Sequence, residues 1–148
     1  MNKNVLKINY LAVIVAAVAA FVVGSLWYSP FLFGNAWMEL RGMNPGAMAD
    51  MTIPAWQTLG EFVRSLVVAY VLARFVVLLG VVNRRDAVQL GAWVWIGFPA
   101  MLLVGSVMWE NVPWMLAAIH AGDWLVKILL VAVILGVWRS GKPRNKND

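Results

Sequence analysis

The sequence has 148 residues, of which 62% are hydrophobic and 13% are charged, with a net charge of +5. A soluble domain carries about 25% charged residues, so this composition excludes an ordinary soluble globular protein. There is no cysteine and there is one histidine, His120. Disulfides, thiolate metal sites and multi-histidine sites within one chain are therefore excluded, and we expect no metal and no cofactor. The basic residues flank apolar segments instead of forming a groove, so we expect no nucleic-acid partner.

Residues 8–28 form the first predicted membrane span, because they contain no charged side chain over a length that crosses a bilayer. The apolar run is longer than that of a signal peptide, and it continues into Trp27-Tyr28 without a small-residue cleavage site. We therefore expect an uncleaved helix. Small residues recur at every fourth position and predict a face for close helix packing: Ala12, Ala16, Ala20 and Gly24.

The segment from Ser29 to Gln57 is the long connection of the chain. Ser29-Pro30 ends the first helix, because proline lacks an amide hydrogen and restricts the residue before it. Residues 31–41 then mix aromatic and polar side chains, as a short amphipathic helix lying in the membrane interface does.

Three further spans are predicted at residues 58–82, 87–109 and 114–138. Pro99 lies inside the third of them and predicts a kink. The fold class that follows is an all-α integral membrane protein, a bundle of four transmembrane helices with a short interfacial helix between the first and second. We expect residues 1–148 to form a single membrane domain, with a basic, disordered tail at 139–148.

The distribution of basic residues predicts the orientation of the bundle. With four spans, both termini and the turn after the second span lie on one side of the membrane. That side would carry eight basic residues, whereas the loops of the other side carry Arg41 alone. Because basic residues mark the cytoplasmic side, we expect both termini to be cytoplasmic and the protein to reside in the inner (plasma) membrane. The basic residues on the predicted cytoplasmic side are Lys3, Lys7, Arg84, Arg85, Arg139, Lys142, Arg144 and Lys146.

Charged and polar side chains inside the second and fourth spans form the candidate site. His120, Asp123 and Lys127 share one face of the fourth helix, and Asp123 and Lys127 are spaced to pair at i, i+4. Glu61 and Arg64 lie at a similar depth on the second span. We expect Asp123 to be ionised and paired with Lys127, with Arg64 as a further partner. The cluster has two interpretations: a device that holds the helices together, or a proton relay or site for a polar substrate group.

The run from Trp27 to Trp37 resembles a known family. It is similar to the small bacterial and fungal membrane proteins catalogued as domain of unknown function 1761, and the likeness extends over nearly the whole chain. Members of that family usually have an aromatic residue where this chain has Asp123, so the resemblance does not imply a family-wide role for the Asp123–Lys127 pair. It implies the architecture and leaves the activity open. The residues of the interfacial motif that carry it are Trp27, Tyr28, Ser29, Pro30, Phe33, Gly34 and Trp37.

The sequence favours a non-enzymatic membrane component, which forms a homo-oligomer or joins a larger membrane complex, because it lacks the phosphate loop, dinucleotide fingerprint and nucleophile elbow of common enzymes. One alternative is a small oligomeric transporter or channel that uses the polar cluster and the break at Pro99. Another is a binder of lipid or of a hydrophobic ligand, suggested by three deeper tryptophans: Trp93, Trp95 and Trp124.

Overall fold

The computed structural model describes residues 7–138, and the regular structure within them is helical. The predicted disordered tail at 139–148 lies outside the described residues. In chain order the elements are α1 (Tyr10–Trp27), α2 (Gly34–Leu40), the 3-10 helix η1 (Pro45–Asp50), α3 (Ala55–Leu78), α4 (Arg84–Trp95), the π-helical turn η2 (Ile96–Ala100), α5 (Met101–Trp109) and α6 (Trp114–Val137). The predicted all-α class is confirmed.

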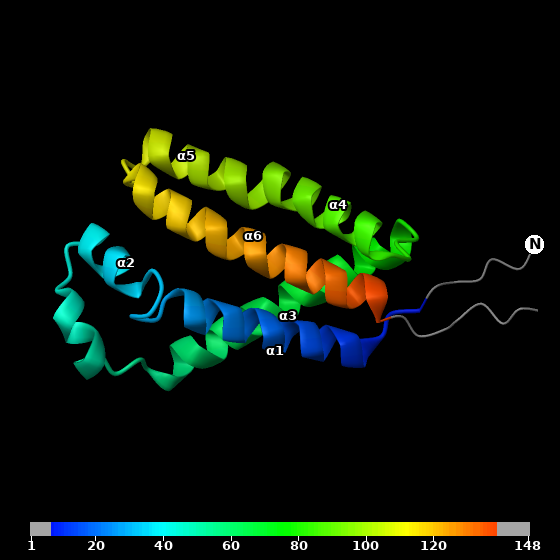
Figure 1. The fold of residues 1–148 in the computed structure, drawn as a ribbon, viewed down its shortest axis with the longest axis horizontal. Coiled ribbons are helices and arrows are strands. Elements are labelled where there is room, and N and C mark those ends of the chain that lie inside the picture. The colour runs from blue at the N-terminus through cyan, green and yellow to red at the C-terminus, as the bar shows by residue number, and fades with distance from the viewer. Residues whose placement is uncertain (1–6, 139–148) are drawn as a thin grey trace, which may run out of the picture.

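Helix α6 lies at the centre of the bundle, between α1 on one side and the α4–α5 helix on the other (Figure 1). Helix α3 passes obliquely across α1 and α6 and contacts both. The start of α1 and the end of α6 lie at the same end of the bundle, where Asn9 Nδ2 donates to the carbonyl of Trp138 at 3.4 Å. The turn between α3 and α4 lies there too, because Gly136 of α6 packs against Ala87.

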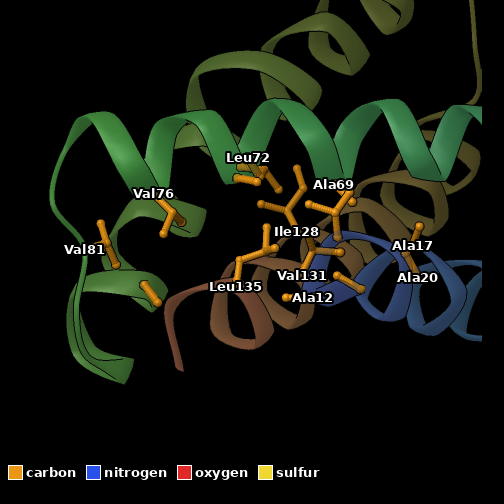
Figure 2. Close-up of a cluster of buried hydrophobic side chains, with 14 residues drawn as sticks. Ala12, Ala17, Ala20, Ala69, Leu72, Val76, Val81, Ile128, Val131 and Leu135 are labelled. Atoms are coloured by element: carbon orange, nitrogen blue, oxygen red, sulfur yellow. The ribbon is translucent and has the colours of Figure 1, made fainter. Parts of the chain in front are cut away.

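The apolar core lies where α1, α3 and α6 meet (Figure 2). The small side chains of α1 face larger ones from the other two helices, among them Leu72 and Val76 of α3 and Val131 of α6. The predicted packing face of α1 is buried along its whole length, with Ala12 and Ala16 at 0% exposure and Ala20 at 3%. Because alanine adds only a methyl group to the helix surface, α1 approaches its neighbours closely.

Three helices in the described residues are long and apolar enough to cross a membrane, whereas the sequence predicts four spans. The three are α1, the continuous helix Arg84–Trp109 and α6. The exception is α3, which has 24 residues and is therefore long enough to cross. Its charged residues Glu61, Arg64 and Arg74 lower its hydropathy. The difference therefore concerns the polarity of this helix and not its length.

Helix α3 begins and ends earlier than the predicted limits of 58 and 82. It starts directly after Pro54 and ends at Leu78. Gly80 follows with a φ of +64°, and the amide of Val81 donates to the carbonyl of Val76 at 3.0 Å. This arrangement is a Schellman motif, in which a glycine in the left-handed conformation closes the helix. Asn83 then caps α4 by accepting a hydrogen bond from the amide of Asp86 at 2.9 Å.

The irregularity expected at Pro99 takes the form of a π-helical turn, η2, between α4 and α5. Proline cannot donate the backbone hydrogen bond that an α-helix needs at this position. A wider turn accommodates that loss without ending the helix, so residues 84–109 remain one continuous helix.

Candidate functional site

Four of the five predicted polar residues form a row of ion pairs between α3 and α6, which we call the charge ladder. Lys127 Nζ is 2.9 Å from Asp123 Oδ2 and 3.4 Å from Glu61 Oε1. Arg64 then pairs with Glu61 at 2.8 Å. The expected pairing of Asp123 with Lys127 is present, but Arg64 pairs with Glu61 and not with Asp123. The charge ladder therefore links α6 to α3 through Lys127, which has a carboxylate partner on each helix.

Gly24 of α1 makes room for the ammonium group of Lys127. A Cβ atom added at Gly24 would lie 2.5 Å from Lys127 Nζ and 2.7 Å from its Cε, which is far inside van der Waals contact. Lys127 is 4% exposed and Asp123 is 1% exposed, so both charges lie within the bundle. At Gly24, its last position, the small-residue face of α1 thus accommodates a charged side chain as well as a neighbouring helix.

Trp124 lies beside both cations of the charge ladder. Its ring centroid is 5.1 Å from Arg64 Cζ and 5.9 Å from Lys127 Nζ, distances at which an aromatic face attracts a cation. A small opening adjoins these groups, with a volume of about 10 Å³, which is room for one water molecule. Its lining combines polar and apolar side chains: Ala20, Glu61, Arg64, Ser65, Val68, Trp124, Lys127 and Val131.

Asp123 holds its two carboxylate oxygens in different surroundings. Oδ2 accepts from Lys127, whereas the buried Oδ1 accepts no hydrogen bond from the described part of the chain. An unpaired buried polar atom destabilises the folded state by about 1–3 kcal/mol. Within the described residues, Asp123 is therefore paired through one of its two carboxylate oxygens.

His120, the fifth predicted residue, lies outside the charge ladder and pairs with Tyr28. The Tyr28 hydroxyl is 2.6 Å from His120 Nδ1, and the Tyr28 ring also meets the edge of Trp37 at 5.8 Å between centroids. Helical spacing places His120 one turn before Asp123, so the two share a face, but the C-terminal end of α1 provides the nearer partner. The hydrogen bond joins the end of α1 to α6.

Two tryptophans that the sequence analysis assigned to other roles bind the same turn of α6 through its backbone. Trp27 Nε1 donates to the carbonyl of Ile119 at 3.0 Å, and Trp95 Nε1 donates to the carbonyl of Ala121 at 2.8 Å. The Trp27 ring also covers Gly122, where an added Cβ would lie 2.7 Å from the ring. Trp27 from α1 and Trp95 from α4 thus hold α6 on both sides. In the sequence, the only sign of these contacts is the pair of small residues Ala121-Gly122.

The interfacial motif forms a tight turn between α1 and α2. The amides of Phe33 and Gly34 donate to the carbonyls of Trp27 and Ser29, each at 3.0 Å. An added Cβ at Gly34 would lie 2.3 Å from the carbonyl oxygen of Tyr28, so only glycine fits this close approach. Phe33 stacks on Trp27 with centroids 4.6 Å apart. The turn therefore fixes Trp27 and Tyr28, which in turn hold α6.

The site is a set of polar contacts that join α6 to α1, α3 and α4. Within residues 7–138, no group of three His, Cys, Asp or Glu side chains could hold a metal ion. Trp93, the third of the deeper tryptophans, lies on α4 and is 65% exposed.

The comparisons with known proteins identify a family and no activity. Neither a curated protein sequence nor a solved structure matches the chain. A family model described as "Protein of unknown function (DUF1761)" matches residues 11–136. This match covers most of the chain, including all the residues of the charge ladder and the interfacial motif, and the chain therefore belongs to that family of proteins of unknown function.

Proposed function

We propose that this protein is a non-enzymatic component of the inner membrane, which acts by assembling with itself or with another membrane protein. The observation that carries the proposal is the internal pairing of its polar groups. Lys127 is bonded to Asp123 and Glu61, Tyr28 to His120, and the indoles of Trp27 and Trp95 to backbone carbonyls. Groups paired in this way stabilise the bundle. The outer surface of the bundle remains for contacts with another copy or another membrane protein.

The proposal includes a fourth span, α3, and cytoplasmic termini. Lys127 of α6 pairs with Glu61, and the ring of Trp124 lies beside Arg64. Helix α3 therefore enters the membrane as part of the bundle, although it is too polar to do so alone. The start of α1, the α3–α4 turn and the end of α6 lie together, as an even number of crossings requires. Basic residues at that end support a cytoplasmic location.

A second candidate, a small transporter, is favoured by two observations. The unpaired Oδ1 of buried Asp123 and the water-sized opening beside Lys127 are features of a path for protons or a polar group. An opening of about 10 Å³ does not admit a solute larger than water, so transport of a larger solute would need a second conformation. The closed conformation favours the assembly role.

The test is purification from the native host in a mild detergent, followed by mass spectrometry of intact complexes. The assembly role predicts a stoichiometric protein, either a second copy or another membrane protein. A chain that purifies as a monomer with a retained polar small molecule would contradict it.

The matched variant is Asp123→Asn combined with Lys127→Met, which removes both members of the buried pair. The assembly role predicts that this double variant retains the same protein partner. If the double variant is as stable as the wild type but a proton-linked flux in proteoliposomes disappears, the transporter replaces the assembly role as the function.

A further inference from the structure

An ion pair of the charge ladder, Glu61 with Arg64, reaches the outer surface of α3 within the first half of that helix. The side chain of Arg64 is 54% exposed and that of Glu61 is 33% exposed. Arg64 lies nine residues after the start of α3 at Ala55, a depth of about 14 Å at ~1.5 Å per residue. The apolar layer is ~30 Å thick, so lipid chains would surround these charges, at a considerable energetic cost.

The exposed positions of α3 follow the spacing of a helix–helix interface. Six of them alternate in steps of four and three residues, the spacing at which one helix packs along another. Val67 and Val71 lie in the middle, and Gly60, beside Glu61, has open space where a Cβ would be, so that a second backbone can come close. The positions of this α3 seam are Gly60, Arg64, Val67, Val71, Arg74 and Leu78.

We propose that a second copy of this chain covers the α3 seam, so that two α3 helices pack side by side around a two-fold axis. In a symmetric dimer each surface must complement itself. Glu61 and Arg64 meet this condition, because Arg64 of each copy can pair with Glu61 of the other, giving a neutral group of four charges shielded from lipid. The inference rests on the assembly role and on the span that we propose for α3.

Arg74 is the one cation of the α3 seam that such a dimer leaves to other partners. It lies four residues before the end of α3 at Leu78, only about 6 Å along the helix axis. A long arginine side chain reaches the headgroup region over that distance, where water and lipid phosphates separate the two copies of Arg74. The dimer therefore does not bring these two charges together inside the apolar layer.

The experiment is disulfide cross-linking in native membranes, for which the absence of cysteine in the chain is an advantage. Single cysteines are introduced at Val67 and Val71 in the α3 seam. Control cysteines are introduced at Leu102 of α5 and Ile14 of α1, which are 72% and 50% exposed. We expect a dimer of two tagged copies from the seam positions and little or none from the controls. Arg64→Gln in the Val67→Cys chain should lower the dimer-to-monomer ratio on the order of tenfold, and Arg64→Lys should restore part of it.

The remaining outcomes each overturn the dimer and identify its replacement. Equal cross-linking at all four positions indicates random collisions. A cross-link from Val67→Cys to a different protein indicates a hetero-complex, in which case the assembly role survives and the dimer fails. Modification of Val67→Cys by a membrane-impermeant maleimide indicates a water-filled crevice, and then both the dimer and the assembly role fail. If Arg64→Gln does not fold, the cross-linking pattern of the otherwise unchanged chain still decides between these outcomes.

Discussion

Lys127 contacts more helices than any other residue of the charge ladder, because it has partners on three of them. It bonds to Asp123 on its own helix and to Glu61 on α3, and its ammonium fits against Gly24 of α1. Each contact depends on the others, since a buried ammonium tolerates few changes in its surroundings. Substitutions at these positions should therefore act together and not independently.

Removing one member of the buried pair should destabilise the protein more than removing both. Asp123→Asn leaves Lys127 with Glu61 as its only carboxylate, and we expect a loss of about 3–5 kcal/mol. The double variant Asp123→Asn/Lys127→Met should recover much of it, as measured by unfolding in detergent. Losses that simply add in the double variant would show that the two residues do not interact.

Gly24→Ala should destabilise the protein because its methyl group occupies the place of Lys127 Nζ. We expect a loss on the order of 1–3 kcal/mol, as for other overpacked sites. The same substitution in a Lys127→Met background should have a smaller effect, since a methionine side chain adapts its shape. A loss of equal size in both backgrounds, measured by thermal unfolding, would assign the requirement for glycine to the backbone instead.

Among the helices, α1 presents a face of small side chains to neighbours whose side chains are larger. Its face of small residues is buried against α3 and α6, whereas its other face is exposed, as at Val22. This asymmetry explains why the periodicity of alanine was informative in the sequence. Every fourth residue of a helix returns to nearly the same side, so the packing face could be identified without knowledge of its partners.

Enlarging that face should disrupt the bundle. We expect Ala16→Leu to lower stability by about 1–3 kcal/mol through overpacking, because Ala16 has no exposed surface. Val22→Leu, on the face of α1 that is 47% exposed at this position, serves as the control and should be nearly neutral. Equal melting temperatures for the two variants would mean that the spacing of alanine has no structural meaning.

The sequence predicts a feature well where a local rule determines it. It predicts a contact poorly where that contact depends on how two helices pack against each other. Helical spacing alone brings Asp123 and Lys127 together, and Pro30 alone limits α1. The contact of Tyr28 with His120 joins residues that are 92 positions apart, so no local pattern contains it. The end of α3 was missed for another reason: Gly80 lies in an apolar run, and hydropathy does not register a left-handed backbone.

In the molecule as a whole, the basic turn of Arg84 and Arg85 between α3 and α4 lies at the same end of the bundle as the start of α1 and the end of α6. Helix α2 and the interfacial motif lie at the other end (Figure 1). Helix α3, the most polar of the long helices, packs against both α1 and α6. The position of a marginally apolar helix is therefore determined by its neighbours, a property of the assembled bundle that no single segment reveals.

Reporter fusions test the resulting orientation. Fusions after Asn83 and after Lys142 should both read as cytoplasmic, because the basic residues around these points resist translocation. A fusion after Gly42 should read as periplasmic and serves as the control. The same reading after Gly42 and after Asn83 would mean that α3 does not cross the membrane, and the four-span topology would have to be replaced by one with three.

The hydrogen bond between Asn9 and Trp138 also indicates that the chain could be circularly permuted. Because these residues touch, a short peptide could join the start of α1 to the end of α6, and the chain could be opened instead at Gly42, whose φ of +69° marks an exposed turn. Such a circular permutant would contain the same four helices in a new order of synthesis, with α3 emerging first and α1 last. It would therefore separate the order in which the helices enter the bilayer from the contacts that hold them there.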